Sequence, residues 1–383
     1  MTESRYHICI GPVYPGIGSW EWIGQQMGEE LSQYNEVEFF LDSIPNCDLA
    51  VIVKYDFPRL MDSRPVGVPV IFCPVDCYGS VRDIDHDGKY LFQCSQIITH
   101  SESLRKYFNA YAPVEYLDHH VRFISETLSL KPEEGPILWT GIRSNLPPLI
   151  EWINRNPLDR ELWILTNLDQ GTSTISPREF DFTRNQTVRI ENWEPQKHIA
   201  WAELASCAMD VKGTDFRARH KPPAKAIDSL ASCLPLAMNA DSSSVKHLAR
   251  RGFQIASIED QALWFSSEYR DQTLEYAAKL RKTHSRENIG KRFKSIIDRV
   301  LNEESSKQKN SLDLPPELES SDTNASKPEE PSYQPPESQA HQKIAIVSFL
   351  YNWPSTGGGN IHTMELVQFL GRAGYEVQHF CVR

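Results

Sequence analysis

The sequence predicts an α/β protein with two doubly wound parallel-sheet domains, a linker, and the start of a further domain of the same kind. Three observations support this prediction. Short apolar runs alternate with helical patterns over residues 1–303. Residues 304–342 lack apolar periodicity, and residues 343–383 again read as strand, glycine-rich loop, helix and strand.

Composition and charge narrow the class of protein. The 383 residues are 40% apolar, 24% charged and 10% aromatic, as in ordinary globular domains. The net charge of -11 argues against a nucleic-acid partner, which needs a basic face. We expect a cytoplasmic chain, because no apolar run reaches the ~18 residues of a membrane span. The eight cysteines lie mostly in apolar runs without paired C-x-x-C spacing, which predicts reduced core thiols.

The first domain is predicted at 1–122 and has Rossmann-like alternation. Its strands are apolar runs of four or five residues, too short for helices and mostly bounded by turn residues. The predicted strands are 6–10, 37–41, 49–53, 68–72, 96–99 and 114–117, with helices at 21–34 and 101–107.

The second domain is predicted at 123–303 and repeats the alternation. The predicted strands are 136–141, 161–165, 188–190, 209–213, 234–237 and 253–256. The predicted helices are 146–154, 196–206, 223–232, 260–270, 272–283 and 285–301. Three consecutive helices therefore close the domain.

A disordered linker is predicted at 304–342, and a second α/β unit at 343–383. The linker is rich in Ser, Pro, Glu and Lys, so it cannot bury enough apolar surface to offset its ordering entropy. The segment after it contains a strand, the glycines 357–359, a helix and another strand. This βαβ half-unit cannot bury its sheet alone, so we expect a fragment of a longer tandem enzyme.

The order of features at 343–383 resembles a known family. Pro354, the three glycines, His362 and the run 372–377 (RAGYEV) are similar to the opening of family-4-like, GT-B-type glycosyltransferases. The two doubly wound domains predicted at 1–303, with their helical finish, resemble the GT-B layout of the same family. The resemblance implies transfer of a hexosyl group from a nucleotide sugar to an acceptor hydroxyl, with retention of configuration and without a metal or other cofactor.

A second similarity places the donor site in the second domain. Residues 225–236 (KAIDSLASCLPL) resemble the family's K-x-x-E-x-x-A-x-G-x-P motif, which marks the nucleotide-binding helix. By resemblance, Asp228 stands where a carboxylate binds the ribose hydroxyls. The cations expected near the diphosphate are Arg143, Arg217, Arg219, Lys221 and Lys225. The alternative is a solvated loop with Lys225 and Asp228 as a surface pair.

Several positions depart from the family pattern. Asp228 replaces Glu, Cys233 replaces Gly, and His220 stands where a first Glu belongs. In the first domain, Val75 and Asp76 replace a His-Asp pair. Since losing one stabilising donor costs about 10²- to 10³-fold in rate, we expect residues 1–303 to be a weak or inactive transferase, with the main activity in the unit that begins at 343.

The first strand is followed by a glycine-containing loop. Gly16 and Gly18 let the backbone approach a ligand or the facing domain, and we assign them to the donor site. The third glycine of a G-x-G-x-x-G fingerprint is replaced by Glu21, which argues against a dinucleotide site and against an oxidoreductase. A plain tight turn is the alternative.

Residues 83–88 match the first half of an EF-hand loop. The match fails at its twelfth position, Cys94, so we expect no metal and instead an acidic loop facing the interdomain cleft. There Asp76 and His86 are the candidate catalytic residues contacting an acceptor sugar. His119 and His120 begin the interdomain crossover, where hinge packing is favoured over a metal pair.

The sequence therefore predicts a glycosyltransferase that uses a UDP- or GDP-hexose donor and a glycan, lipid-linked or protein acceptor. The absence of a transmembrane segment still allows peripheral membrane contact. The alternative is a catalytically weak domain that binds nucleotide sugar or glycan and positions an active partner domain.

Overall fold

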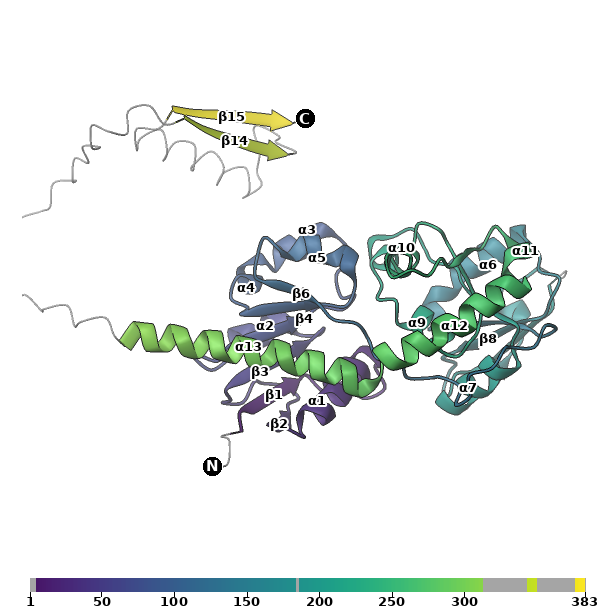
Figure 1. Ribbon diagram of the computed structural model, residues 1–383, viewed down its shortest axis with the longest axis horizontal. Coiled ribbons are helices and arrows are strands. Elements are labelled where there is room, and N and C mark those ends of the chain that lie inside the picture. Colours follow the sequence, from purple (N-terminus) through teal and green to yellow (C-terminus); the bar gives the residue numbers. More distant parts are fainter. Residues whose placement is uncertain (1–4, 184–185, 313–342, 350–375, 383) are drawn as a thin grey trace, which may run out of the picture. The chain divides into compact units, whose positions relative to one another are not determined.

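The computed structural model describes residues 5–183, 186–312, 343–349 and 376–382. The chain divides into two compact units, Met1–Leu314 and Pro315–Arg383. Two sheets, the first parallel and the second parallel except at one edge strand, form the centre of the first unit (Figure 1). In the described residues, no helix is long and apolar enough to cross a membrane.

The first sheet has six parallel strands in the order β2-β1-β3-β4-β5-β6. They are β1 (His7–Gly11), β2 (Glu36–Phe39), β3 (Leu49–Val53), β4 (Val70–Cys73), β5 (Gln96–Thr99) and β6 (Val114–Tyr116). Every residue of β3, β4 and β5 is buried, as expected when both faces of a parallel sheet are covered. The strand predictions for this domain are confirmed to within two residues at each end.

The helices of the first domain are short. They are η1 (Trp20–Gln25), α1 (Gln26–Leu31), α2 (Phe57–Asp62), α3 (Val81–His86), α4 (Gly88–Leu91) and α5 (Glu102–Phe108). The predicted helix 21–34 begins with the π-helical turn η1, where a Cβ on Gly24 would lie 2.2 Å from the Trp20 ring. The prediction of an acidic loop at 83–88 is wrong, because residues 81–86 form the helix α3. Ser80 caps this helix by accepting from the Asp83 N–H at 3.2 Å.

The second sheet has the order β13-β12-β11-β7-β8-β10-β9 and is parallel except for the edge strand β9. Its strands are β7 (Ile137–Thr140), β8 (Leu162–Thr166), β9 (Thr174–Ile175), β10 (Val188–Asn192), β11 (Cys207–Asp210), β12 (Leu236–Met238) and β13 (Ala256–Ser257). The chain order reverses between β7 and β11. This reversal is the topological switch point, where open α/β sheets bind ligands.

The helices of the second domain flank this sheet. They are η2 (Arg143–Asn145), α6 (Leu146–Arg155), η3 (Pro177–Phe180), α7 (Pro195–Leu204), α8 (Phe216–Arg219), α9 (Ala224–Ala231), α10 (Ser243–Arg250), α11 (Gln261–Trp264) and α12 (Ser267–Thr283). The helix predicted at 260–270 is interrupted, because α11 ends at Trp264 and Ser266 caps the new helix α12 by accepting from the Tyr269 N–H.

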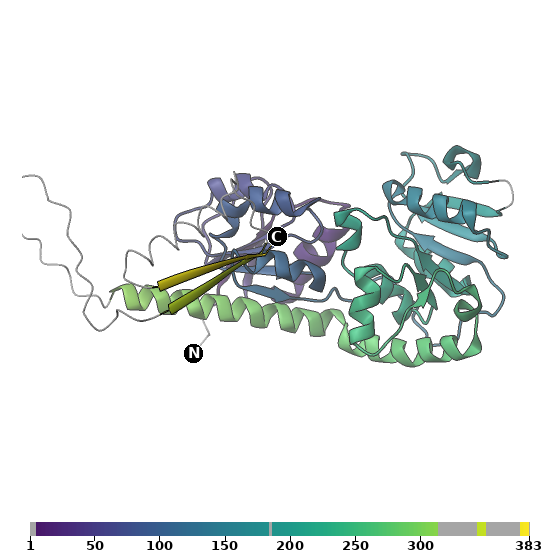
Figure 2. The ribbon, with the colours of Figure 1, turned by 90° about the horizontal axis from the view of Figure 1, so that it is seen from above.

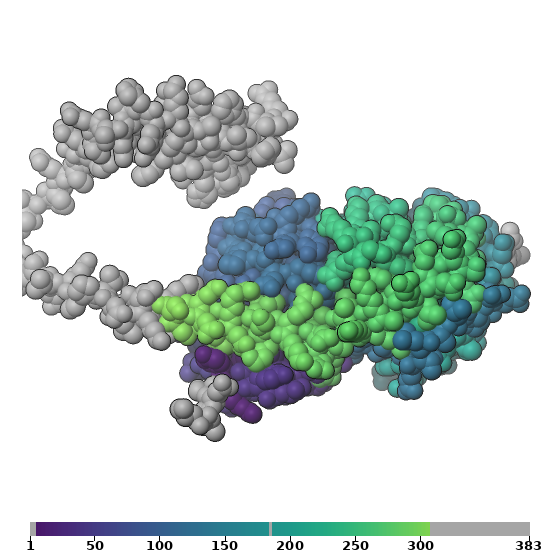
Figure 3. Space-filling model, in the orientation of Figure 1, coloured from purple at the N-terminus to yellow at the C-terminus, as the bar shows by residue number. Residues whose placement is uncertain are grey.

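The last helix of the unit, α13 (Arg286–Leu312), returns to the first domain. Figures 1 and 2 show it running along the side of the first sheet, and Figure 3 shows its outer face. Its apolar residues join the core of that sheet: Ile289, Phe293, Ile296, Ile297, Val300 and Leu301. Residues 286–301 therefore complete the first domain, although the sequence assigned them to the second. The helix also continues to Leu312, where the linker was expected to begin at 304.

A buried carboxylate joins the two domains at the crossover. The side chain of Asp118 is fully buried and accepts hydrogen bonds from Arg292 Nη1 at 2.7 Å and from the Tyr116 hydroxyl at 2.7 Å. Arg251 Nη1 lies 3.0 Å away, and His247 Nε2 lies 3.5 Å away. Burial alone would raise the pKa of Asp118, but its bonds to His247, His284 and Arg292 hold the pKa far below its usual value.

The second unit contains two described strands. β14 (Lys343–Phe349) and β15 (Glu376–Val382) pair in parallel over all seven residues, as the predicted βαβ half-unit requires. Its glycine loop at 357–359 and His362 lie outside the described residues, as do 313–342 of the predicted linker.

Candidate functional site

Three lysines gather at the switch point of the second sheet. Lys212 follows the end of β11, Lys221 lies in the loop before α9, and Lys225 lies in the first turn of α9. Their partners Thr140 and Asn145 lie at or after the end of β7, the strand beside β11, whose carboxyl end lies at the same edge. We call Lys212, Lys221 and Lys225 the lysine cluster.

Lys225 is the most enclosed member of the cluster. Its Nζ donates to the carbonyl oxygen of Thr140 at 2.6 Å and lies 5.1 Å from the centre of the Trp139 ring. Gly141 makes room for it, since a Cβ there would stand 2.6 Å from this Nζ. Burial, opposed by Asp210, lowers the pKa of Lys225 to about 7.

The other two lysines have polar partners. Lys212 Nζ lies 2.5 Å from Asp210 Oδ2, and Lys221 Nζ donates to Asn145 Oδ1 at 2.8 Å. Burial would raise the pKa of Asp210, but Lys212 and Lys225 outweigh it and lower that pKa. With all three lysines protonated and Asp210 ionised, the group carries a net charge of +2 (three minus one).

This arrangement suits an anion with two adjacent negative groups. The ammonium groups lie beside the N-terminus of α9, whose unpaired N–H groups and dipole favour phosphate. A small cavity continues beneath them, between Thr140, His198, Asp210 and Ser229. Among the described residues, His198 Nδ1 has no hydrogen-bond partner in this buried position, and burial lowers the pKa of His198 to about 4.

Asp228 points away from the lysine cluster and toward the interdomain crossover. It is 3% exposed, and its Oδ1 accepts from the Arg122 N–H at 2.9 Å. Burial raises the pKa of Asp228 to about 7, although the hydrogen bonds from the N–H groups of Arg122 and Phe123 act to lower it. The ribose role assigned to Asp228 stays a prediction, and this carboxyl already holds the crossover in place.

Cys233 has the backbone conformation that the family's glycine would have. Its φ is +59°, in the left-handed region that favours glycine, and its side chain is 2% exposed. The turn at the end of α9 therefore keeps its shape despite the substitution. His220 stacks on Phe216 and meets the ring of Tyr107 in the first domain, so it contributes to domain packing.

The three candidate arginines are dispersed around the cluster. Arg143 begins η2, next to the Asn145 that binds Lys221, but its guanidinium lies 3.5 Å from Asp169 Oδ2. Arg217 donates to the carbonyl oxygen of Cys77 in the first domain at 2.7 Å. Arg219 lies 3.8 Å from Asp241 and is exposed.

The facing edge of the first sheet carries an ion pair. Lys54 Nζ donates to Asp76 Oδ1 at 2.7 Å, and both side chains are less than 20% exposed. Burial lowers the pKa of Lys54, but Asp76 more than offsets this, and the pKa is raised. Asp76 also acts electrostatically on Lys221 across the domain boundary, opposing the fall in the pKa of that lysine.

The remaining candidates of the first domain are exposed. His86 is the last residue of α3, while Asp76 follows β4. Gly16 has a φ of +77° with open space around it, so its backbone conformation rather than a close contact favours glycine. Gly18 lies beside Trp22, and a Cβ on Gly18 would stand 3.8 Å from the Trp22 ring.

Sequence reasoning missed Lys54, Asp210 and Lys212 as site residues. Each lies at or just after the carboxyl end of a buried strand, where an isolated charged residue interrupts or follows an apolar run. That position was the available signal, since the carboxyl ends of parallel strands form the ligand-binding edge.

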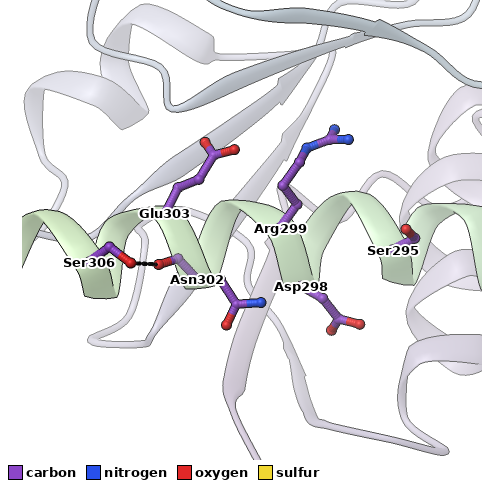
Figure 4. Close-up of a pocket in the computed structure, with 6 residues that line it drawn as sticks. All are labelled: Ser295, Asp298, Arg299, Asn302, Glu303 and Ser306. Carbon is purple, nitrogen blue, oxygen red and sulfur yellow. Dashed lines mark hydrogen bonds between the residues drawn. The ribbon is translucent and has the colours of Figure 1, made fainter.

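A wider hollow lies along the outer face of α13, remote from this edge. It is shallow and polar, and Figure 4 shows the six side chains that line it: Ser295, Asp298, Arg299, Asn302, Glu303 and Ser306. Arg299 also pairs with Glu115 of β6. Because it is open to solvent and its lining side chains do not converge on an enclosed space, it is a poorer ligand site than the lysine cluster.

Comparison with solved structures identifies the architecture. An E. coli trehalose-6-phosphate protein bound with UDP-2-fluoro glucose superposes with a TM-score of 0.53 and 8% identity, covering 78% of this chain and 99% of that one. AviGT4, a glycosyltransferase involved in avilamycin A biosynthesis, gives a TM-score of 0.52 and 12% identity, with 78% and 98% coverage. The chain has the GT-B fold.

A third GT-B structure is similar to the same share of the chain. It is an α-glucosyltransferase in complex with UDP and a 13-mer DNA containing an HMU base, with a TM-score of 0.50 and 12% identity, covering 78% of this chain and 100% of that one. No protein-family model matches the sequence, and a search of curated proteins gives no match.

Proposed function

We propose that the first unit binds a nucleoside-diphosphate sugar at the lysine cluster and transfers the sugar to an acceptor hydroxyl. The observation that carries this proposal is the cluster itself. Three ammonium groups and one carboxylate gather at the switch point of the second sheet, beside the N-terminus of α9. Their net charge of +2 matches a diphosphate, whose charge grows as the sugar leaves.

The finer features of the reaction are part of the same proposal. The similar structures bound with UDP or with a UDP sugar support a UDP-hexose donor, with GDP as the alternative base. The lysines supply the charge that a metal would otherwise provide, so the reaction is metal-independent. Configuration is retained, no further cofactor takes part, and the acceptor is a glycan, a lipid-linked sugar or a protein in the cytoplasm.

Binding without efficient transfer is the second candidate function. Two observations favour it: Asp76 is already paired with Lys54, and the carboxyl of Asp228 is engaged by the crossover backbone. In that case the unit holds a nucleotide sugar or glycan and positions an active partner domain. Asp76 and His86 then contact the acceptor without acting as catalytic groups.

The decisive experiment removes the enclosed ammonium while keeping an unbranched side chain of nearly the same length. In Lys225→Met, we expect UDP to bind about 1.5–3 kcal/mol more weakly in calorimetry, the value of a hydrogen bond to a charged group. Lys246→Met is the matched control, because Lys246 is exposed on α10 of the same domain. Unchanged UDP and GDP affinity in Lys225→Met would refute the site.

Donor hydrolysis then separates the two functions. A transferase hydrolyses its nucleotide sugar slowly when no acceptor is present, and Lys225→Met abolishes that activity. A binding domain holds the donor intact over the same time, with the affinity still dependent on Lys225.

A further inference from the structure

The connection between β2 and β3 is unusual for a parallel sheet. β2 ends at Phe39 and β3 begins at Leu49, and these strands lie on either side of β1, so residues 40–48 must cross that strand. Parallel strands are normally joined by a dozen or more residues, usually including a helix. Residues 40–48 contain no helix, so this crossover has little regular structure to hold it.

Three potential metal ligands converge under this crossover. His7 and Cys9 lie two residues apart on β1, so their side chains share one face, and Cys9 pairs in register with Glu38 on β2. His7 Nε2 lies 3.1 Å from Glu38 Oε2 and 3.7 Å from Cys9 Sγ. The three ligand atoms all lie within 4.8 Å of one another.

A fourth candidate comes from the crossover itself. Cys47 is half-buried and packs against the hydrophobic cluster that contains Cys9. Asp48 fixes this end of the crossover on β1: the His7 N–H donates to Asp48 Oδ2 at 2.7 Å, and the Asp48 N–H donates to the carbonyl oxygen of His7 at 2.9 Å.

We propose that His7, Cys9, Glu38 and Cys47 bind a zinc ion that fastens the crossover to β1 and β2. Tetrahedral zinc takes sulfur, nitrogen and carboxylate ligands, with bonds of about 2.0–2.3 Å that set neighbouring ligand atoms about 3–4 Å apart. Binding replaces two S–H bonds by two Zn–S bonds and releases two protons to solvent.

The chemistry of the surroundings favours zinc over hard cations and makes the site accessible. Two thiolates and an imidazole select a soft or borderline metal rather than magnesium or calcium. Cys9 is fully buried, whereas the side chains of His7 and Glu38 are 29% and 51% exposed, which leaves an entry path. The site begins at His7, the first residue of β1, and lies in the first domain. The lysine cluster lies in the second domain, at the carboxyl ends of its strands. We therefore treat the metal site as structural and independent of donor binding.

Cobalt(II) titration of the reduced, metal-free full chain tests this site. Cobalt in a tetrahedral site with thiolate ligands gives charge-transfer and intense visible bands. We expect these bands to saturate at one equivalent and to disappear on adding zinc. We also expect zinc to raise the midpoint of thermal unfolding while leaving UDP affinity unchanged.

Variants assign the ligands. Cys47→Ser should remove most of the charge-transfer band, and Glu38→Gln should weaken cobalt binding while keeping the band. Cys77→Ser is the matched control, because Cys77 is a half-buried cysteine elsewhere in the same domain. Circular dichroism verifies that each variant is folded; both Cys47 and Glu38 are at least partly accessible, so the test does not depend on replacing the buried Cys9.

Three results would overturn the proposal. They are the absence of thiolate–cobalt bands in the wild-type chain, bands that persist unchanged in Cys47→Ser, and a disulfide between Cys9 and Cys47 in protein isolated without reductant. The last result would mean that the two sulfur atoms fasten the crossover covalently instead.

Discussion

In both sheets, charged residues lie at or just after the carboxyl ends of central strands, but their net charge differs between the two sheets. At the first sheet, Lys54 and Asp76 neutralise each other in one ion pair. At the second sheet, three lysines share one carboxylate, Asp210, and leave a net charge of +2 when all three are protonated. The same fold therefore gives one edge that suits a neutral sugar and one that suits a diphosphate.

The loops at the carboxyl edge of the first sheet also contain residues with an unusual backbone conformation. Lys54, Asp56 and Val75 follow β3 and β4 with positive φ angles of 66°, 54° and 56°. A left-handed conformation costs a residue with a side chain roughly 1–2 kcal/mol, and it is especially unfavourable for the β-branched Val75. Such strain often accompanies functional loops, and here it occurs in the two loops that carry the Lys54–Asp76 pair.

The largest expected effect comes from the residue that joins the two regions. Asp118→Ala leaves Arg251, Arg292 and the nearby histidines without their buried partner. We expect a loss of about 3–5 kcal/mol in the free energy of unfolding, measured by urea denaturation. Asp298→Ala on the exposed part of α13 is the control and should change stability little, because its pair with Lys294 is partly exposed.

Asp118 also predicts a pH dependence. Its pKa is lower in the folded than in the unfolded chain, so its contribution to stability is present above the unfolded value and is lost as the pH falls. The wild-type protein should therefore lose more stability on acidification than Asp118→Ala does. Equal slopes for the two proteins would contradict this account of the crossover.

A smaller effect contrasts the lysines at the two edges. Lys221→Ala should weaken UDP binding by about 1.5–3 kcal/mol, since it removes one cation from the cluster. The double variant Lys54→Met/Asp76→Asn should leave UDP affinity unchanged, because it removes a pair whose charges already cancel. Calorimetry on both variants measures the difference, and an equal loss would place the diphosphate between the two sheets rather than on the second one.

The smallest expected effect is a proton taken up on binding. Because the pKa of Lys225 is lowered to about 7, this lysine is largely neutral at pH 8 in the free protein. A bound diphosphate raises that pKa, so UDP binding at pH 8 should take up a fraction of a proton. Calorimetry in buffers of different ionisation enthalpy measures the uptake, which should vanish in Lys225→Met and be smaller at pH 6.

The same shift has a consequence for stability. Between pH 7 and the unfolded value of 10.5, the folded chain binds fewer protons at Lys225 than the unfolded chain. The contribution of this group to stability therefore rises with pH across that window.

The strands were predictable from the sequence because their burial leaves a direct pattern. The run 49–53 is apolar at every position and forms β3 with those bounds. The surface against which each helix packs was not predictable in this way. The pattern of 285–301 shows that one face is buried, but it does not identify which domain supplies the partner, and Ile289 and Phe293 pack against the first.

The candidate site was predictable only in part. Lys221 and Lys225 were found because they precede a helix after a buried strand, and the structure brings them together. The orientation of Asp228 was not predictable, because it depends on the Arg122 N–H, a partner 106 residues away in the chain. Single charges such as Lys212 carry no periodic signal. The place of Lys212 after an apolar strand predicts only that it lies at the ligand-binding edge, and the strand order is needed to place it at the cluster.

The return of α13 to the first sheet has a consequence for synthesis. Phe293 and Ile297 are fully buried in the core of the first domain, yet they leave the ribosome after the whole second domain. At translation rates of about 5–20 residues per second, the N-terminal sheet waits on the order of ten seconds or more for its last helix. During this interval the apolar surface beside β1 is uncovered, and a chaperone has its opportunity to bind the nascent chain there.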